Sequence, residues 1–225
     1  MTDLHNWTPR PKPERKILEG RYVRLEPLDA EKHGDELFAA SSVRDAHQRF
    51  TWLFEFPPAT RSEFSPWLEN ASNSEDPLFF VVIDKASGKI GGRQALMNTK
   101  FEHGVIEIGN VYWGPLISRK PAATEAQFLF MQYIFDALGY RRYEWKCNND
   151  NGPSKRAAER FGFQFEGVFR QHYVVKGCNR DTAWFSVLDS EWPALKRAYQ
   201  AWLAPENFDS EAQQKRKLEE FRNLG

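Results

Sequence analysis

The sequence is poor in cysteine and has no long apolar segment. Its 225 residues include two cysteines, Cys147 and Cys178, which lie far apart and form no Cys-x-x-Cys motif. A disulfide-stapled scaffold and a structural zinc site are therefore not expected, no metal is predicted, and free thiols suit a reducing compartment. The N-terminus lacks the apolar core of a signal peptide, and no apolar run approaches the length of a membrane span. We expect a cytoplasmic protein that does not enter a membrane.

The sequence also has no excess of either charge. Lysine and arginine number 31, and aspartate and glutamate also number 31, so the formal net charge is zero. Without a basic excess, bulk electrostatics do not favour nucleic acid or a membrane surface, and we expect neither as a partner. Aromatic residues, in contrast, make up 15% of the chain and include eight tryptophans. A large core and an aromatic-lined pocket both explain this content.

Composition divides the chain into one domain and two tails. Residues 1–20 are polar and rich in proline, which predicts an extended arm that wraps the domain or stays loose. Residues 21–204 carry the periodic apolar segments of a single domain. Residues 205–225 are charged and only weakly amphipathic, which predicts a helical tail on the surface rather than in the core.

The periodic segments of the domain predict a mixed α/β fold. Expected strands lie at 21–28, 77–84, 90–99, 104–114, 140–148 and in a long hairpin over 163–189 that turns at 176–179. Expected helices begin at Asp29, occupy parts of 44–74, run up to Gly139 and to Gly162, and return at 190–204. The helix before Gly139 stands between two strands, as a crossover between parallel neighbours requires.

The segment Ser118–Tyr140 leads from a loop of small residues into a long amphipathic helix. The free backbone N–H groups at such a helix start suit a phosphate. Yet no glycine occurs between Gly114 and Gly139, and Pro121, which has no N–H, stands in the entry. The segment alone leaves an anion site and an ordinary helix start both open.

Several short motifs occur in an order that resembles a known enzyme family. They are "EIGNVYWG" (107–114), "ATEA" (123–126), Asn151-x-x-Ser154 followed by "GF" (162–163), "EG" (166–167) and "RDTAWFS" (180–186). In this order, over roughly residues 20–190, the chain resembles the GNAT N-acetyltransferases of the RimJ/RimL-like branch. The resemblance implies the GNAT acyl-CoA N-acyltransferase fold, of class α/β (α+β): a mixed, mostly antiparallel sheet with a splayed parallel strand pair, flanked by helices.

The resemblance also implies a reaction. GNAT enzymes hold acetyl-CoA, their co-substrate, in a cleft between two splayed strands, with the pyrophosphate at the start of the helix that follows the first of them. A primary amine on a small molecule, an aminoacyl conjugate or a peptide N-terminus attacks the thioester directly in a ternary complex. The alternative is a catalytically weak CoA-binding or sensor module of the same fold, suggested by two departures from the family pattern, Pro121 and Ala158.

The family's pyrophosphate motif, Gln/Arg-x-x-Gly-x-Gly/Ala, fits this chain in two registers, which begin at Ser118 and at Arg119. The two small positions fall on Pro121 and Ala123 in the first register, and on Ala122 and Thr124 in the second. The basic pair Arg119-Lys120 lies beside the expected pyrophosphate in both. The acetyl-CoA-binding residues that the resemblance implies are Tyr112, Trp113, Arg119, Lys120, Ala122, Ala123, Thr124, Asn148, Asn151 and Ser154.

Glu107, Asn151 and Ser154 are the catalytic candidates. Glu107 is the leading base, because an amine arrives as ammonium and a partly buried carboxylate with a raised pKa suits the removal of its proton. A glutamate on an exposed sheet face is the alternative. By resemblance, Asn151 and Ser154 lie beside the thioester, although a turn residue and a helix cap explain them equally.

Ala158 occupies the place of the tyrosine that usually protonates the leaving thiolate in this family. Ser154, Tyr173 or a water must then donate the proton, or the thiolate leaves unassisted. His172 ranks below Glu107 as a base.

The acceptor side is expected between the aromatic segment 50–68 and the hairpin tip 174–180. These residues suit a bulky or partly apolar acceptor, and core packing explains them equally. Arg180 and Asp181 are either substrate-side residues or a structural pair, and the pair is the preferred interpretation. A homodimer stays possible.

Overall fold

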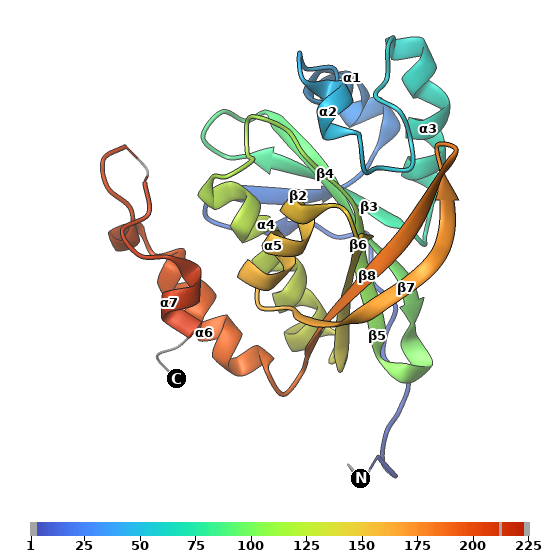
Figure 1. The fold of residues 1–225 in the computed structure, drawn as a ribbon. Helices are drawn as coiled ribbons and strands as arrows, with labels where there is room; N and C mark the ends of the chain where they lie inside the picture. Colours follow the sequence, from blue (N-terminus) through green and yellow to red (C-terminus); the bar gives the residue numbers. More distant parts are fainter. Residues whose placement is uncertain (1–3, 212, 223–225) are drawn as a thin grey trace.

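The computed structural model describes residues 4–211 and 213–222 and contains one eight-stranded sheet (Figure 1). The strand order is β1-β2-β3-β4-β5-β6-β8-β7, and β5–β6 is its parallel pair. The strands are β1 (Leu18–Glu19), β2 (Val23–Pro27), β3 (Leu78–Asp84), β4 (Ile90–Lys100), β5 (Val105–Trp113), β6 (Arg142–Asn148), β7 (Gln164–Val175) and β8 (Cys178–Leu188).

The helices cover both faces of this sheet. Asp29 caps the first of them, as predicted, by accepting a hydrogen bond from the Lys32 backbone N–H. The helix predicted up to Gly139 ends in a π-helical turn, Tyr133–Ala137, before Gly139 adopts a φ of 68°. The α-helices are α1 (Ala30–Ser41), α2 (Ala46–Arg49), α3 (Arg61–Asn73), α4 (Pro121–Gln132), α5 (Gly152–Arg160), α6 (Trp192–Trp202) and α7 (Leu218–Arg222). Short 3₁₀ turns lie at Phe101–His103 and Pro205–Asn207.

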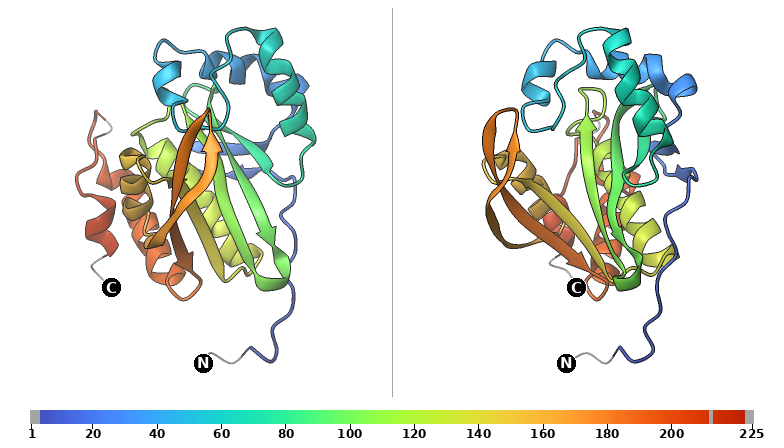
Figure 2. Two further views of the ribbon diagram at one scale, coloured as in Figure 1. Left: turned by 45° about the vertical axis from the view of Figure 1, so that its right-hand side comes forward. Right: turned by 90° about the vertical axis from the view of Figure 1, so that its right-hand side faces the viewer.

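Two hydrophobic clusters place the sheet between layers of helices. α4 and α6 cover one face, and α1 and α3 cover the other face over β3 and β4 (Figures 1 and 2). Alternate residues of β3 enter the two clusters: Phe80 and Val82 join the α4 side, while Phe79 and Val81 join the α1–α3 side. The prediction that this apolar strand is buried on both faces is therefore confirmed.

The parallel strands β5 and β6 diverge part of the way along their length. Their pairing ends at Ile108 opposite Trp145. On the other edge of β5 the register with β4 then shifts, so that Asn110 and Val111 together face Gln94, and Asn110 takes a φ of 51°. This β-bulge turns β5 away from β6. The two halves of the sheet consequently open into a V (Figure 2, right).

The N-terminal arm lies against the domain. Trp7 Nε1 donates to the Glu102 carbonyl at 2.7 Å, and the Tyr140 hydroxyl donates to the Pro11 carbonyl at 3.1 Å. The Glu14 backbone N–H donates to the Tyr133 hydroxyl at 2.9 Å. The described part of the arm, from residue 4, thus wraps the domain instead of staying loose.

The C-terminal segment differs from the surface helix that the sequence predicts. Over residues 205–211 and 213–222, helix is confined to a 3₁₀ turn and to α7. Leu218 is fully buried in the main core, and Phe208 packs edge-on against Tyr22 and Trp202. The segment has two widely spaced apolar residues, Phe208 and Leu218, with a turn between them, instead of the continuous apolar face of a helix. Both residues pack against the core. The domain limits at residues 20 and 204 stay predictions.

Candidate active site

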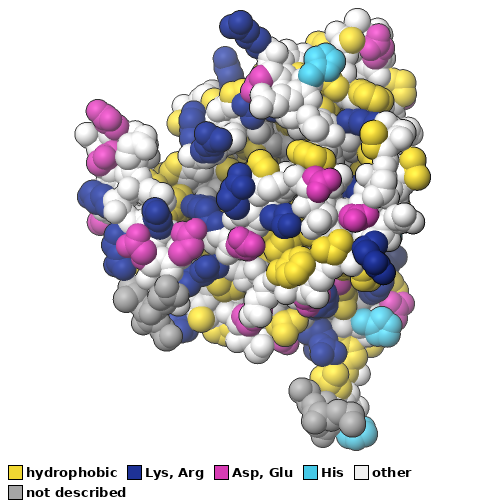
Figure 3. Space-filling view, in the orientation of Figure 1, with side chains coloured by type: hydrophobic (Ala, Val, Ile, Leu, Met, Phe, Trp, Pro, Cys, Tyr) yellow, Lys and Arg dark blue, Asp and Glu magenta, His cyan; other side chains and the backbone are white. Residues whose placement is uncertain are grey.

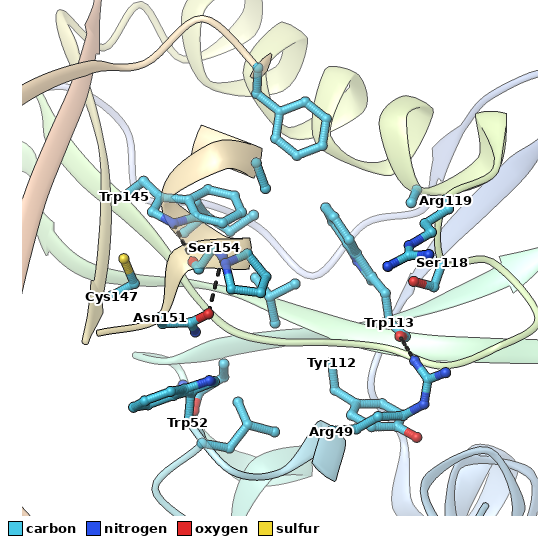
Figure 4. Close-up of a pocket in the computed structure, with 18 of the residues that line it drawn as sticks. Arg49, Trp52, Tyr112, Trp113, Ser118, Arg119, Trp145, Cys147, Asn151 and Ser154 are labelled. Atoms are coloured by element: carbon cyan, nitrogen blue, oxygen red, sulfur yellow. Dashed lines mark hydrogen bonds between the residues drawn. The ribbon is translucent and has the colours of Figure 1, made fainter. Parts of the chain in front are cut away.

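A cavity of about 1510 Å³ opens where β5 and β6 diverge (Figure 4). Typical ligand pockets measure roughly 300–1,000 Å³, so there is room for a ligand larger than most metabolites. One wall comes from the end of β6 and from α5, and the facing wall comes from β5 and the start of α4. The loop after α2 and the C-terminal segment contribute as well, the latter through Trp202, Phe208, Glu211, Gln213 and Gln214.

The start of α4 forms one end of this cavity. Lys120 is the N-cap and Pro121 occupies the first turn, where the missing N–H of a proline removes no intrahelical hydrogen bond. Pro121 is therefore compatible with an anion site. In the loop before it, the backbone N–H groups of Ser118 and Lys120 donate to Gly114 and Ile117, while Arg119 has a φ of 62°. This strained turn carries the Arg119 side chain to the cavity wall (Figure 4).

The predicted residues of this loop divide between wall and core. Ser118, Arg119, Lys120, Ala123 and Thr124 line the cavity. Ala122 instead belongs to the hydrophobic core and is not among the lining residues, because its position on α4 faces the sheet. The Ala122 side chain therefore does not contact the cavity.

Arg160 is a basic residue of the site that the sequence analysis missed. Its Nη1 donates to Thr124 Oγ1 at 3.0 Å, and its guanidinium lies 5.0 Å from the Trp202 ring. It reaches the cavity from α5, 36 residues after Thr124, and no local pattern in the sequence indicates this contact. With Arg119 and Lys120, it makes the α4 end of the cavity strongly basic. Such a cluster fits the phosphates of a CoA ester.

Asn151 and Ser154 lie on the α5 wall. Asn151 is the N-cap of α5, and its Oδ1 accepts from the Ser154 backbone N–H at 3.1 Å. Ser154 Oγ accepts from Trp145 Nε1 at 3.0 Å (Figure 4). Asn151 therefore has a capping role, whereas Ser154 is not a cap. Both residues also line the cavity, as does Asn148 at the end of β6.

Tyr112 and Trp113 form the β5 wall. The Tyr112 hydroxyl donates to the Ala40 carbonyl at 2.7 Å, and burial raises the pKa of Tyr112 to about 12. The Trp113 indole N–H donates to Gln94 Oε1 at 3.2 Å, and its ring lies edge-on to Phe161 across the cavity. These bonds fix two aromatic surfaces beside the divergence of the strands.

Glu107 lines the cavity as a buried side chain and is not exposed on the sheet face. Its side chain accepts from Asn98 Nδ2 at 2.7 Å and pairs with Lys146 Nζ at 2.7 Å. Burial raises the pKa of Glu107, although the adjacent Lys146 ammonium opposes this shift. Lys146 also lies 2.9 Å from Glu144 and sits 3.9 Å from the Trp184 ring. Lys146, Glu144 and Asn98 were not predicted from the sequence as residues of this site.

Ala158 does not face the cavity. It is fully buried in the main core, whereas Ala157 lines the cavity wall one residue earlier. Successive helix residues point about 100° apart, so a side chain at position 158 could not point directly at the cavity from this helix. Ala157 is the small residue that borders the site here.

Arg180 and Asp181 do not form the structural pair that the sequence analysis preferred. Asp181 accepts from the Gln171 backbone N–H at 2.7 Å and from Asn179 Nδ2 at 2.9 Å, whereas Arg180 lines the cavity. Consecutive strand residues point to opposite faces, which separates their side chains. His172 lies outside the main cavity, in an open hollow of the β7–β8 hairpin.

On the expected acceptor side, the aromatic segment 50–68 and the hairpin tip contact each other at the border of the cavity. Lys176 Nζ, at the hairpin tip, donates to the Phe50 carbonyl at 2.7 Å, and the Phe54 ring meets the Tyr173 ring edge-on. Trp52, Leu53 and Phe54 line the cavity next to this contact.

On the side of the molecule shown in Figure 3, acidic and basic residues are mixed over the surface. Within the described residues, no helix has the length and apolar character needed to cross a membrane.

Comparisons with known proteins identify the family. A GCN5-related N-acetyltransferase from Brucella melitensis is 81% identical, with a TM-score of 0.98 over 98% of this chain and 100% of that chain. The uncharacterized N-acetyltransferase p20 of Bacillus licheniformis is 31% identical over 50% of this chain and 63% of its own length. YdaF of Bacillus subtilis (strain 168), provisionally named a ribosomal N-acetyltransferase, is 28% identical over 80% of this chain and 98% of its own. These names agree with the RimJ/RimL-like branch. The model of the acetyltransferase (GNAT) domain matches residues 23–164, and the chain is therefore an acyltransferase of the GNAT family.

Proposed function

We propose that this enzyme transfers the acetyl group of acetyl-CoA to a primary amine bound between the loop 50–56 and the hairpin tip. The observation that carries the proposal is the divergence of β5 and β6 within one cavity, which reaches from the basic start of α4 to the buried Glu107. Use of acetyl-CoA is general to the family, whereas the acceptor and the residue roles are our inference.

The charges and the open strand edge support a site for the co-substrate. Arg119, Lys120 and Arg160 would pair with its phosphates at the start of α4. Beyond Ile108, the edge of β5 that faces β6 has no strand partner among the described residues, so its backbone groups are available to an extended pantetheine. Asn151 and Ser154 would then lie near the thioester.

Glu107 is the group best suited to take the proton of the amine. The incoming ammonium loses a proton to the Glu107 carboxylate, directly or through a water, and the free amine nitrogen bonds to the thioester carbonyl carbon. The carbon–sulfur bond then breaks, and the second proton of the attacking nitrogen passes through a hydroxyl or a water to the leaving thiolate, which gives the amide and free CoA thiol. Ser154 is the preferred donor, because it lines the cavity and its oxygen only accepts from Trp145 Nε1, so that bond does not use the Ser154 O–H.

The acceptor is a small molecule, an aminoacyl conjugate or a peptide N-terminus. Trp52 and Phe54 on its side of the cavity support a bulky or partly apolar molecule.

Calorimetry with acetyl-CoA and thiol release against a panel of amines test the proposal. The panel comprises peptide N-termini, polyamines, aminoacyl nucleotides and aminoglycosides. We expect acetyl-CoA binding that weakens in Arg160→Gln, and thiol release that requires an amine. Binding without turnover on any amine would favour the catalytically weak module, and absence of acetyl-CoA binding would overturn both readings.

A further inference from the structure

We propose that the acceptor carries an oxyanion, a carboxylate or a phosphate, which pairs with Arg180 while the amine lies near Glu107. The inference rests on the proposed acetyl transfer and narrows its acceptor class. Arg180 lines the cavity on the side away from α4, next to the loop 50–56.

Arg180 is a buried cation without a counterion. Its exposed fraction is 7%, its Nε has no hydrogen-bond partner, and no carboxylate of the described residues lies within 4.0 Å of the guanidinium. Burial without a counterion is costly for a charged group. Two other buried cations of the cavity region do have carboxylates: Arg93 pairs with Glu55, and Lys146 pairs with Glu107. The missing anion at Arg180 is what an acceptor would supply.

Aromatic rings hold this guanidinium without satisfying its charge. It lies 4.7 Å from the Phe54 ring and 5.7 Å from the Tyr173 ring. Contacts with the ring faces leave the N–H groups in the guanidinium plane available, and this edge binds carboxylate and phosphate in a bidentate manner. The arrangement thus orients Arg180 for an oxyanion.

Strand register places Arg180 on the same face as the candidate base. Trp184 lies opposite Lys146, and Thr182 lies opposite Asn148, the last residue of β6. Because every second strand residue shares a face, Arg180 continues this row beyond the end of β6. Thr182 Oγ1 and Trp184 Nε1 in the same row are also buried, and neither has a hydrogen-bond partner among the residues that the structure describes. Between Lys146 and Arg180, this face of β8 therefore presents polar atoms whose hydrogen bonds are not made within the described residues.

The row also bears on the size of the acceptor. Four residues of extended strand, from Arg180 to Trp184, span about 13 Å of backbone, which favours an acceptor whose oxyanion and amine are separated by several bonds. An ω-amino acid of several carbons or a short peptide fits this distance better than glycine does.

Matched acceptor pairs test the inference. We would measure kcat/KM for ω-amino acids from glycine to 6-aminohexanoate against their carboxamides, and for phosphoethanolamine against ethanolamine. Calorimetry of N-acetyl-6-aminohexanoate against its amide gives a readout that needs no turnover. The variants are Arg180→Gln, Arg180→Lys and the control Asp181→Asn, whose side chain faces away from the cavity.

We expect the wild type and Asp181→Asn to prefer the charged member by about 10- to 100-fold, the range of a charge-assisted hydrogen bond. Arg180→Gln should lose this preference and keep its activity on neutral amines, while Arg180→Lys keeps part of it. A preference for the carboxylate pair or for the phosphate pair identifies the oxyanion.

Equal use of charged and neutral acceptors by the wild type would overturn the inference and leave the proposed function intact. An equal loss on all acceptors in Arg180→Gln would also overturn it, and would assign Arg180 to holding the loop 50–56. Absence of thiol release with every amine would instead count against the proposed function, while preferential binding of the acetylated carboxylate would still support Arg180.

Discussion

The Lys146 ammonium lies 2.7 Å from the Glu107 carboxylate, although Lys146 is the first residue of β6 beyond its pairing with β5. The pair thus spans the point where the two strands begin to diverge. Burial favours the neutral form of Glu107, and Lys146 favours its charged form. The protonation of the candidate base therefore depends on the balance between its burial and a cation on the neighbouring strand.

Glu107→Gln should lower kcat/KM by about 10²- to 10⁴-fold, the usual contribution of a general base. Acetyl-CoA affinity should stay unchanged, because the phosphates are proposed to bind at the basic start of α4 and not at this side chain. Thiol release and calorimetry measure the two quantities. An unchanged rate would remove Glu107 from the role of base.

The pH dependence follows from the raised pKa of Glu107. Between the ordinary value of 4.5 and the raised value, the folded protein binds a proton that the unfolded chain has lost. Folding stability from this group therefore falls as the pH rises through that window, while the active carboxylate form increases. We expect a kcat/KM limb that rises with pH above 4.5 and is independent of the acceptor's amine pKa. Its persistence in Glu107→Gln would assign the limb to another group.

Lys146→Met should move this limb to higher pH. Removal of the ammonium takes away the charge that lowers the Glu107 pKa and leaves only the Asn98 hydrogen bond to oppose the effect of burial. Lys146→Arg, which keeps the charge, is the matched control and should leave the limb near its wild-type position. Steady-state kinetics from pH 5 to 9 on both variants decide the matter, and an unmoved limb in Lys146→Met would contradict the coupling.

The sequence predicted element types and the wall residues well, because local periodicity and family motifs determine both. Asn151 and Ser154 on α5 and Tyr112 on β5 line the cavity as expected. Arg160 and Lys146 escaped prediction because each acts through a contact between elements distant in sequence. The local pattern of a strand does not predict which residue of the neighbouring strand its lysine will contact.

The prediction that Arg180 and Asp181 form a structural pair was wrong because of the local geometry of the strand. Adjacent residues on a strand face opposite ways, and this alternation was sufficient to exclude the pair before the structure was known. The prediction of a surface helix for the C-terminal segment was wrong for a different reason: its apolar anchors, Phe208 and Leu218, are widely spaced in a charged stretch, and Leu218 is buried through the packing of α7 on α6.

Arg119→Gly and Arg119→Ala separate charge from backbone conformation at the start of α4. Both remove the guanidinium, so both should weaken acetyl-CoA binding by a similar factor of about 10. At a φ of 62°, alanine is strained and glycine is not, so the glycine variant should be about 1 kcal/mol more stable than the alanine variant. Calorimetry and urea unfolding test the two effects. Unequal affinities with equal stabilities would show that the turn, rather than the charge, matters for binding.

Leu218→Ala tests whether the C-terminal segment belongs to the domain. The side chain is fully buried in the main core, so its truncation should lower the free energy of unfolding by about 2–5 kcal/mol. Leu188→Ala, at a side chain that is 40% exposed, is the control and should cost much less. Because Phe208 and Gln214 of this segment line the cavity, acetyl-CoA affinity should fall in Leu218→Ala but not in Leu188→Ala. Urea unfolding and calorimetry measure both effects, and a cost below about 1 kcal/mol for Leu218→Ala would show a detachable tail instead.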